Sequence, residues 1–314
     1  MLSCQGIDGK TLTPAADGQL PAQCVWIDLQ NPSEDETRRV ERATGLDLPS
    51  QDQMRAVEMS SRVRFEGDAL YLNVPYFTHD PDQPATPLGL IVSSKTLVSI
   101  RYADSPAFGI AAEALRASKE RSGVVAFTGL IGAIVGQIAD RMEAIAAKSG
   151  ALAPRILGEQ QHTTKMLRAT LSEVGHLEGH LTRTRLTMTG LLRILVFTHE
   201  SAPEWIGKAD AARLKLAHKD LDVLCELDGQ LTDKLQFLLD AVLGFINIDQ
   251  NDVMKILTVA SVASIPPIIL VGIWGMNFVR MPELKWPYGY PMALTAIALS
   301  VIIPVLWFKR RGWL

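Results

Sequence analysis

One short motif in the last quarter of this 314-residue chain has side chains that could hold a metal ion. Gly275, Met276 and Asn277 lie in a long stretch that carries no charged residue. Several copies of Asn277 arranged around an axis would form a ring of amide oxygens without formal charge. Mg²⁺ gives up its water shell reluctantly and binds through those waters, so such a ring suits a hydrated Mg²⁺ ion. Asn277 therefore predicts an ion-binding ring, and Gly275 would let the backbone adapt where the helix ends.

The uncharged stretch before this motif carries small, hydroxyl and aliphatic side chains at helical spacing. Two isoleucines, Ile265 and Ile268, lie between small or hydroxyl residues at either end. Such a stripe would give a pore with wetted ends and a hydrophobic constriction that gates by losing water. Close packing between membrane helices is the structural alternative for small residues. The stripe comprises Asn251, Met254, Thr258, Ser261, Ile265, Ile268, Gly272 and Gly275.

Two further groups have side chains that attract or bind cations. His176 and His180 lie four residues apart, as zinc ligands can, but no third ligand is evident nearby and a solvated helix face is the preferred interpretation. Between residues 220 and 252 there is one base, Lys234, and many acids, which form either a solvated face or a surface that concentrates cations. The acids are Asp220, Asp222, Glu226, Asp228, Asp233, Asp240, Asp249 and Asp252.

The elements that would position the motif are two membrane-spanning helices. Residues 256–279 and 286–308 contain no Asp, Glu, Lys, Arg or His. A bilayer core of about 30 Å needs roughly 20 helical residues, and backbone groups in lipid must be satisfied internally, so a helical hairpin is expected. The bases at residues 309–311 follow the second run and favour a cytoplasmic C-terminus. A hairpin returns to its starting side, so the N-terminal part, which shows no signal peptide, is expected in the cytoplasm too.

Other features exclude several classes of protein. Residues 122–139 are uncharged but rich in glycine, and charged residues continue the same helical pattern, so we expect a buried soluble helix and not a third span. The net charge of −3 gives no indication of nucleic-acid binding, and three widely spaced cysteines suit a reducing cytosol. No set of nucleophile, base and orienting residue points to an enzyme or to an organic cofactor.

The first 120 residues combine strand and helix signals, which indicate an α/β layer. Ser33 and Glu36 are spaced as a capping box, and Gly45 is placed to end the helix that they begin. Ser50 and Gln53 repeat the same box. Alternating apolar residues predict one lone strand and two strand pairs. These strands are residues 25–29, then 63–66 with 70–77 around a Gly-Asp turn, and 88–93 with 96–101.

From residue 123 onward the pattern is helical. Pro154 and Pro203 are expected to break it, and no turn interrupts residues 208–274, which gives one helix of about 100 Å that enters the membrane. Within this helix an apolar seam is interrupted once, by Asp228, and needs a partner from the preceding helices or from other copies. The seam comprises Leu221, Leu224, Leu231, Leu235, Leu238, Val242 and Phe245.

At the hairpin, the sequence resembles the bacterial CorA magnesium channels. The resemblance is most specific from about residue 247 and looser over the N-terminal two-thirds, where strands 26–29 and 97–101 carry it. It rests on residues 254–258, Pro266-Pro267, Gly275-Met276-Asn277-Phe278, residues 281–284, Trp286, residues 289–291 and residues 308–314.

The resemblance implies an α+β membrane protein of the bacterial inner membrane that assembles as a homopentameric funnel. Each subunit would contribute a cytosolic α/β/α domain, a stalk helix that continues into a pore-lining span, and an outer span. The expected segments are residues 1–122 for the cytosolic α/β domain, 123–253 for the helical region and stalk, 254–275 for the first span, 276–288 for the periplasmic loop, 289–308 for the second span and 309–314 for the basic C-terminus.

The resemblance also implies roles for single residues. The Gly-Met-Asn signature would bind hydrated Mg²⁺ at the periplasmic mouth, and Glu283 in the outer loop would attract cations. Asp80 matches one ligand of a regulatory Mg²⁺ site that closes the channel. The second ligand of that site in the family is an acid on the stalk helix. An ungapped alignment with the family puts Leu216 at this position, so the acid is missing there and Asp220 is left as a substitute. The implied pore-lining positions are Asn251, Met254, Leu257, Gly272 and Asn277, and Lys309, Arg310 and Arg311 match a basic ring around the neck.

The expected function is therefore Mg²⁺ influx, with Co²⁺ and Ni²⁺ as further cargo, gated by intracellular Mg²⁺. Trp274 stands where a tyrosine is usual in the family. Ile268 replaces a threonine that is common in the pore of family members, which removes one polar group that could coordinate the ion.

Two alternatives stay open. One is a Zn²⁺ transporter of the same architecture, although the Gly-Met-Asn form favours magnesium. The other is a non-conducting membrane-tethered cation sensor with the acidic stalk as its ligand site.

Overall fold

The computed structural model describes residues 1–6, 11–12, 21, 24–55, 63–77, 85–158, 163–201, 203–276, 281–282 and 286–313. The chain divides into two compact units. The first consists of Met1–Gly158 and Ser172–Leu238, and the second of Glu159–Leu171 and Leu239–Leu314. Three residues with predicted roles, Asp80, Asn277 and Glu283, lie outside the described residues.

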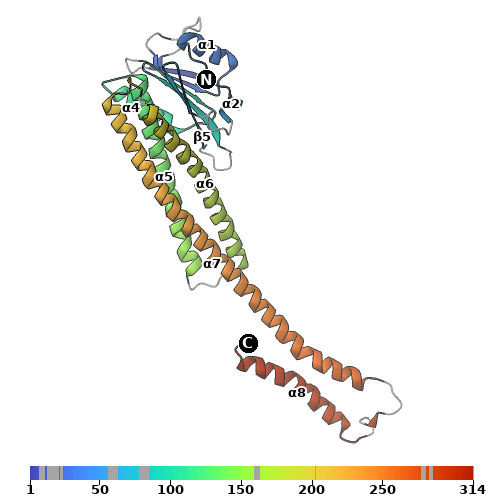
Figure 1. The fold of residues 1–314 in the computed structure, drawn as a ribbon. Helices are drawn as coiled ribbons and strands as arrows, with labels where there is room; N and C mark the ends of the chain where they lie inside the picture. Colours follow the sequence, from blue (N-terminus) through green and yellow to red (C-terminus); the bar gives the residue numbers. More distant parts are fainter. Residues whose placement is uncertain are drawn as a thin grey trace. The chain divides into compact units, whose positions relative to one another are not determined.

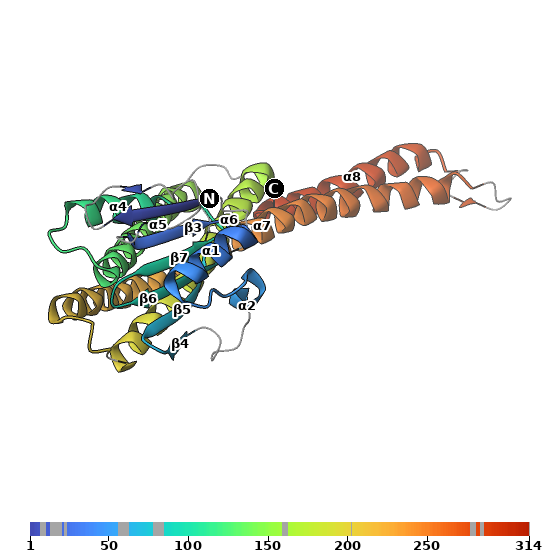
Figure 2. The same cartoon turned by 90° about the horizontal axis from the view of Figure 1, so that it is seen from above.

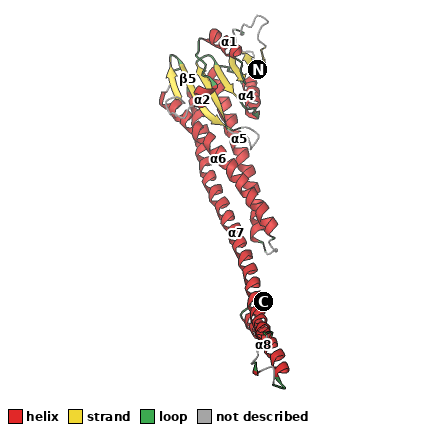
Figure 3. Ribbon diagram, turned by 90° about the vertical axis from the view of Figure 1, so that its right-hand side faces the viewer, coloured by secondary structure: helices red, strands yellow, loops and turns green. Residues whose placement is uncertain are grey.

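The first unit contains a seven-stranded mixed sheet in the order β2-β1-β3-β7-β6-β5-β4, drawn in yellow in Figure 3. Strands β3 and β7 pair in parallel, and the other neighbours are antiparallel. The short first two strands were not predicted from the sequence. The strands are β1 (Leu2–Gly6), β2 (Thr11–Leu12), β3 (Cys24–Gln30), β4 (Val63–Glu66), β5 (Ala69–Tyr76), β6 (Thr86–Ser93) and β7 (Leu97–Arg101).

The local signals read from the sequence are confirmed at the start of the chain. The Ser33 side chain caps α1 (Glu34–Thr44), and the Glu36 carboxylate accepts in turn from the Ser33 backbone N–H at 3.0 Å. Gly45 ends this helix with a φ of 72°, a conformation that suits glycine. Gly67 supplies the left-handed turn between β4 and β5, with a φ of 64°.

Helices cover both faces of the sheet, which gives the predicted α/β/α arrangement. On one face, Val40 of α1 and Met54 of α2 (Gln51–Arg55) join one apolar core with sheet residues such as Ile27 and Ile91. Leu48, in the segment between the two helices, belongs to the same core. On the other face lie α4 (Pro106–Ala117), which the sequence analysis missed, and α5 (Gly123–Leu157), as Figure 2 shows. Trp26 of β3 packs against Phe108 of α4 with 6.2 Å between ring centroids.

Within the described residues, helix α5 is one of three helices long and apolar enough to cross a membrane by length and composition alone. In its most apolar stretch, however, 56% of the residues are buried inside the structure, against 6% for each of the other two. This burial supports the expectation of a packed soluble helix. Pro154 does not break α5 as predicted, since the helix runs on to Leu157 and the Gly158 N–H bonds to the Pro154 carbonyl.

Two long helices complete the helical layer, α6 (Thr164–Ser201) and α7 (Lys208–Trp274). The extent of α7 confirms the uninterrupted helix predicted from the sequence. The seam residues of α7 that belong to the first unit, from Leu221 to Leu238, are buried. The helices that pack against this seam precede α7 in the same chain. Asp228 is also buried, at 5% exposed, and pairs with Arg185 of α6. It therefore does not belong to the solvated acidic face on which the sequence analysis counted it.

The second unit contains the last part of α7 and the antiparallel helix α8 (Gly289–Arg310), which lie side by side in Figures 1 and 2. Helix α8 ends in a tight cap. Gly312 takes a φ of 71°, its N–H bonds to the Lys309 carbonyl at 3.2 Å, and the Trp313 N–H bonds to the Phe308 carbonyl at 3.1 Å. These two bonds form a Schellman motif, and the Phe308 and Trp313 rings, 5.3 Å apart, supply its usual apolar contact.

Candidate ion-conduction site

The predicted pore stripe lies on a single helix, α7, which continues through Pro266 and Pro267 without interruption. Most of its residues are exposed in the single chain, and Ser261 is half-buried. Both hydroxyls in the stripe bond to their own helix: Thr258 donates to the Met254 carbonyl at 2.7 Å and Ser261 to the Leu257 carbonyl at 2.9 Å. Thr258 is half-buried too, and Leu257, which the resemblance adds to the pore lining, is exposed. The exposed members of the stripe are Asn251, Met254, Ile265, Ile268, Gly272 and Gly275.

Helix α8 runs alongside this segment in Figures 1 and 2. One set of less exposed residues recurs every three or four positions along α7. With 3.6 residues per turn, the side chains from Met254 to Gly272 in the stripe project from roughly the opposite side. Thr258, Ser261 and Pro267 are partly buried as well. The set of less exposed residues at helical spacing is Lys255, Val259, Ala263, Pro266, Leu270 and Trp274.

The selectivity motif begins where α7 ends. The Gly275 N–H bonds to the Val271 carbonyl at 2.9 Å, and the Met276 N–H bonds to the Ile273 carbonyl at 3.2 Å. Both residues are exposed. A Cβ at Gly275 would lie 3.0 Å from the Val271 oxygen, so a larger residue would crowd the end of the helix. Asn277, the proposed amide ligand, lies outside the described residues, so the structure does not place its side chain.

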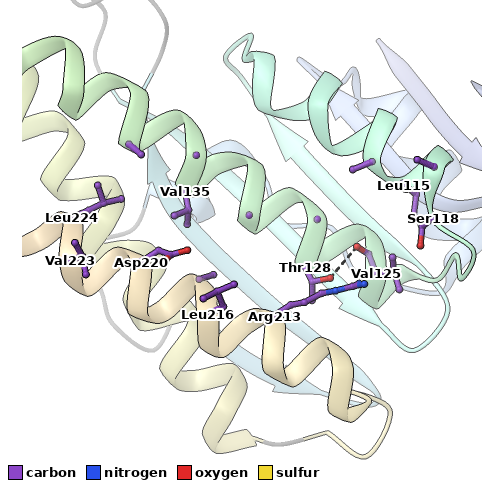
Figure 4. Close-up of a pocket in the computed structure, with 17 residues that line it drawn as sticks. Leu115, Ser118, Val125, Thr128, Val135, Arg213, Leu216, Asp220, Val223 and Leu224 are labelled. Carbon is purple, nitrogen blue, oxygen red and sulfur yellow. Dashed lines mark hydrogen bonds between the residues drawn. The ribbon is translucent and has the colours of Figure 1, made fainter.

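The proposed regulatory residue on the stalk lines a cleft of about 900 Å³ in the first unit (Figure 4). Asp220 and Leu216 are one helical turn apart on α7, and Leu216 is 60% exposed. The facing wall is α5, where Gly129, Gly132 and Gly136 leave room. Asp220 thus has the exposure that a shared metal site would need. The sequence analysis missed this cleft, although the glycines of α5 at intervals of three and four residues indicate it.

The histidine pair has the wrong surroundings for a zinc site. Burial, followed by the positive charges of Arg141, Lys148 and Arg183, lowers the pKa of His180. A site that disfavours one more proton also repels a dication. Among the residues that the structure describes, no group of three or more His, Cys, Asp or Glu side chains could hold a metal ion. These findings favour the solvated-face interpretation of His176 and His180.

The predicted basic neck follows the last turn of α8. Lys309, Arg310 and Arg311 are exposed, and the Arg311 guanidinium lies over the Trp307 ring, 4.6 Å from its centroid. None of the three forms an ion pair with a residue in the described part of the chain. The Schellman cap places Trp313 against α7, where it lines a cavity with Asn251. The sequence analysis did not single out this role of Trp313, although the preceding Gly312 is the usual signal for such a cap.

Comparison with known proteins agrees with this geometry. Over 320 aligned residues the chain is 31% identical to the protein named Magnesium transport protein CorA of Escherichia coli (strain K12), and the alignment covers 100% of both chains. The protein of the same name from Salmonella typhimurium (strain LT2) is also 31% identical, with the same coverage.

Solved structures share the fold. The structure of the CorA magnesium transporter from Methanocaldococcus jannaschii matches with a TM-score of 0.75 at 20% identity, over 100% of this chain and 98% of that one. The ZntB cytoplasmic domain from Vibrio parahaemolyticus matches with a TM-score of 0.54 at 14% identity, over 79% of this chain and 97% of that one. At such low identities these likenesses concern the fold alone. Residues 21–310 match the family described as CorA-like Mg²⁺ transporter protein, and the chain belongs to this family.

Proposed function

We propose that this chain forms a channel for Mg²⁺ influx in the bacterial inner membrane. Membership of the family makes it a membrane transporter and not an enzyme. The observation that carries the proposal is the predicted stripe on α7, in which Met254, Ile265 and Ile268 are exposed in the single chain. One chain cannot enclose a water-filled path, so this stripe becomes a pore lining only when copies surround an axis.

The proposed assembly is a homopentamer with both termini in the cytoplasm. The positive-inside bias supports this orientation, because Lys309, Arg310 and Arg311 follow α8 directly. A hairpin returns to its starting side, so the N-terminal part of the chain would lie in the cytoplasm as well. Each subunit would line the pore with Asn251, Met254, Leu257, Ser261, Ile265, Ile268 and Gly272.

Ion choice would take place at the outer end of this lining. Five Asn277 amides would accept hydrogen bonds from the waters of a hydrated cation, with Gly275 and Met276 at the end of the helix below them. Glu283 of the outer loop would raise the local cation concentration. Ile265 and Ile268 would form an apolar constriction that stops conduction when it loses its water.

The decisive experiment measures Mg²⁺ uptake into vesicles that contain the purified chain. We expect Asn277→Ala to abolish uptake while the oligomer still assembles in cross-linking or size-exclusion experiments. Thr295→Ala, in α8, is the matched control that removes a polar group from the other span and should conduct normally. Normal Mg²⁺ uptake by Asn277→Ala, or none by the parent chain, would support a non-conducting sensor instead.

Closure by intracellular Mg²⁺ is a separate part of the proposal. Asp80, with Asp220 as the substitute partner on α7, would bind Mg²⁺ between neighbouring cytosolic domains. We expect Asp80→Ala to need more internal Mg²⁺ for closure, with an unchanged maximal flux. Asp222→Ala is the control on the stalk, since it removes an exposed acid that does not line the cleft. An identical dose-response in Asp80→Ala and the parent would remove the sensor and leave the pore intact.

The zinc alternative is tested by comparing ions under the same conditions. The relatives at 31% identity are named as magnesium transport proteins, whereas the likeness to ZntB concerns the fold alone. We therefore expect uptake of Mg²⁺, and also of Co²⁺ and Ni²⁺, with and without a pH gradient. Uptake of Zn²⁺ without Mg²⁺ conductance would reverse the assignment.

A further inference from the structure

The capped end of α8 has the features of a phospholipid headgroup site. Lys309, Arg310 and Arg311 follow a 20-residue stretch, residues 289–308, that has no charged side chain. In a spanning helix these three cations therefore lie at the level where lipid headgroups begin. All three are exposed, and none forms an ion pair with a described carboxylate. The charge at this position is thus open to an external anion.

The cap holds these cations in a defined arrangement. The left-handed Gly312 and the two Schellman hydrogen bonds fix the chain immediately after Arg311. Arg311 is stacked over Trp307, which leaves the edge of its guanidinium group available for hydrogen bonds. A side chain that is already ordered loses less entropy when it binds a phosphate. The capped helix end should therefore bind a phosphate more tightly than a frayed tail with the same basic residues would.

A cavity lies beside the cap. Trp313 closes one side of a space of about 410 Å³, and α7 forms the rest of its wall with Asn251, Lys255 and Thr258 among the lining residues. Lys255 is paired with Asp252 at 2.7 Å, so its charge is already balanced. Trp307 and Trp313 are both partly exposed, as aromatic residues at a membrane surface commonly are. Trp313, two residues after Arg311 in the chain, thus connects this cavity with the basic end of α8.

We propose that the end of α8 binds the phosphate headgroup of an anionic phospholipid in the cytoplasmic leaflet. Arg310 and Arg311 donate hydrogen bonds to the phosphate oxygens, Lys309 adds a third positive charge, and Trp313 packs beside the glycerol region. The inference rests on the membrane insertion of the proposed function but does not require conduction. Each base near a membrane surface strengthens such binding several-fold, and salt weakens it.

The test uses the full chain in phosphatidylcholine vesicles that contain a trace of dansyl-labelled lipid. Energy transfer from tryptophan to dansyl-phosphatidylglycerol should exceed transfer to dansyl-phosphatidylcholine, and added salt should reduce the difference. We expect Arg310→Gln/Arg311→Gln to weaken the preference by about thirtyfold at low salt. Arg310→Lys/Arg311→Lys should keep most of it. The control Arg38→Gln/Arg39→Gln removes the same charge from exposed residues of α1 and should behave as the parent does.

Two results would overturn the proposal. The first is an equal preference for phosphatidylglycerol in the Gln double variant and in the parent. The second is displacement of the labelled lipid by millimolar inorganic phosphate, which would assign the cations to a soluble anion. Mg²⁺ uptake measured in the same vesicles separates this question from the proposed function. Lipid preference without uptake would contradict only the channel, and uptake without lipid preference would contradict only the headgroup site.

Discussion

The Nε of Arg185 in α6 lies 2.5 Å from Oδ2 of Asp228 in α7, inside an otherwise apolar helix seam. Arg185 also donates from Nη2 to the Thr232 hydroxyl at 2.6 Å. The other carboxylate oxygen of Asp228 is buried without a hydrogen-bond partner. The acid that interrupts the seam is therefore half of an ion pair that fixes the register of α6 against α7.

Removing only the base from this pair should destabilise the first unit. Arg185→Ala leaves a buried carboxylate without its partner, and we expect a loss of about 1–3 kcal/mol, less than for a fully buried pair because Arg185 is partly exposed. The double variant Arg185→Met/Asp228→Leu should recover most of this stability, because apolar residues of similar size often replace a buried pair without loss. Thermal unfolding of the detergent-solubilised chain measures both. A double variant no more stable than Arg185→Ala would contradict this explanation.

A second prediction concerns the closest approach between α6 and the sheet. A Cβ at Gly190 would collide with Cγ2 of Val74 in β5 and would lie 3.1 Å from Cδ of Pro75. The Thr187 hydroxyl bonds to the Pro75 carbonyl at 2.9 Å nearby, so the helix cannot easily move away. We expect Gly190→Ala to cost about 1–3 kcal/mol in thermal or denaturant unfolding.

The same helix supplies the control for this prediction. Gly175 has nothing within 4 Å of an added Cβ, and it lies on the exposed side of α6. Alanine is the better helix former, so Gly175→Ala should be neutral or should stabilise by up to about 1 kcal/mol. Equal losses in the two variants would mean that contact with Val74 does not decide the choice of glycine at position 190.

Local signals in the sequence were sufficient to predict much of the fold. The capping box at Ser33 and the turn at Gly67 are governed by hydrogen bonds and backbone angles within a few residues, so the sequence shows them directly. The length of α7 followed in the same way from an uninterrupted pattern. The uncharged runs likewise indicated two membrane helices, because length and charge decide that property.

Features that depend on tertiary contacts were harder to predict. Strand β1 has little periodicity of its own and is ordered by pairing with β3. Pro154 was expected to end α5, but the helix runs on to Leu157, with Leu152 and Ile156 buried on either side of the proline. The counterion of Asp228, supplied by a helix more than forty residues earlier, has no signature in the local sequence.

The lowered pKa of His180 predicts how stability depends on pH. Burial and the neighbouring positive charges make the folded chain bind this proton less readily than the unfolded chain, whose ordinary value is about 6.5. The unfolded state therefore gains protons first as the pH falls through that value, and the folded state loses stability relative to it. We expect the thermal midpoint of the parent to fall between about pH 7.5 and pH 5.5 more steeply than that of His180→Gln. Parallel curves for the two chains would show that His180 does not contribute.

The last prediction compares two isoleucines that are almost equally exposed in the single chain. Ile268 of α7 is 66% exposed and Ile303 of α8 is 61% exposed. If copies surround a pore lined by α7, Ile268 faces water and Ile303 faces lipid. We therefore expect Ile268→Cys to react with a charged, membrane-impermeant thiosulfonate and to lose Mg²⁺ uptake. Ile303→Cys should neither react nor lose uptake, because a charged reagent is excluded from the acyl chains.

The reagent is added from the outer side of intact cells, and the parent chain measures background labelling of Cys4, Cys24 and Cys225. Added external Mg²⁺ should slow the reaction at position 268, because the ion and the reagent would share one path. Equal reactivity at positions 268 and 303 would mean that both spans contact the same environment. In that case, the exposed side of α7 would pack against neighbouring helices or lipid, and the small residues of its stripe would serve that packing instead of conduction.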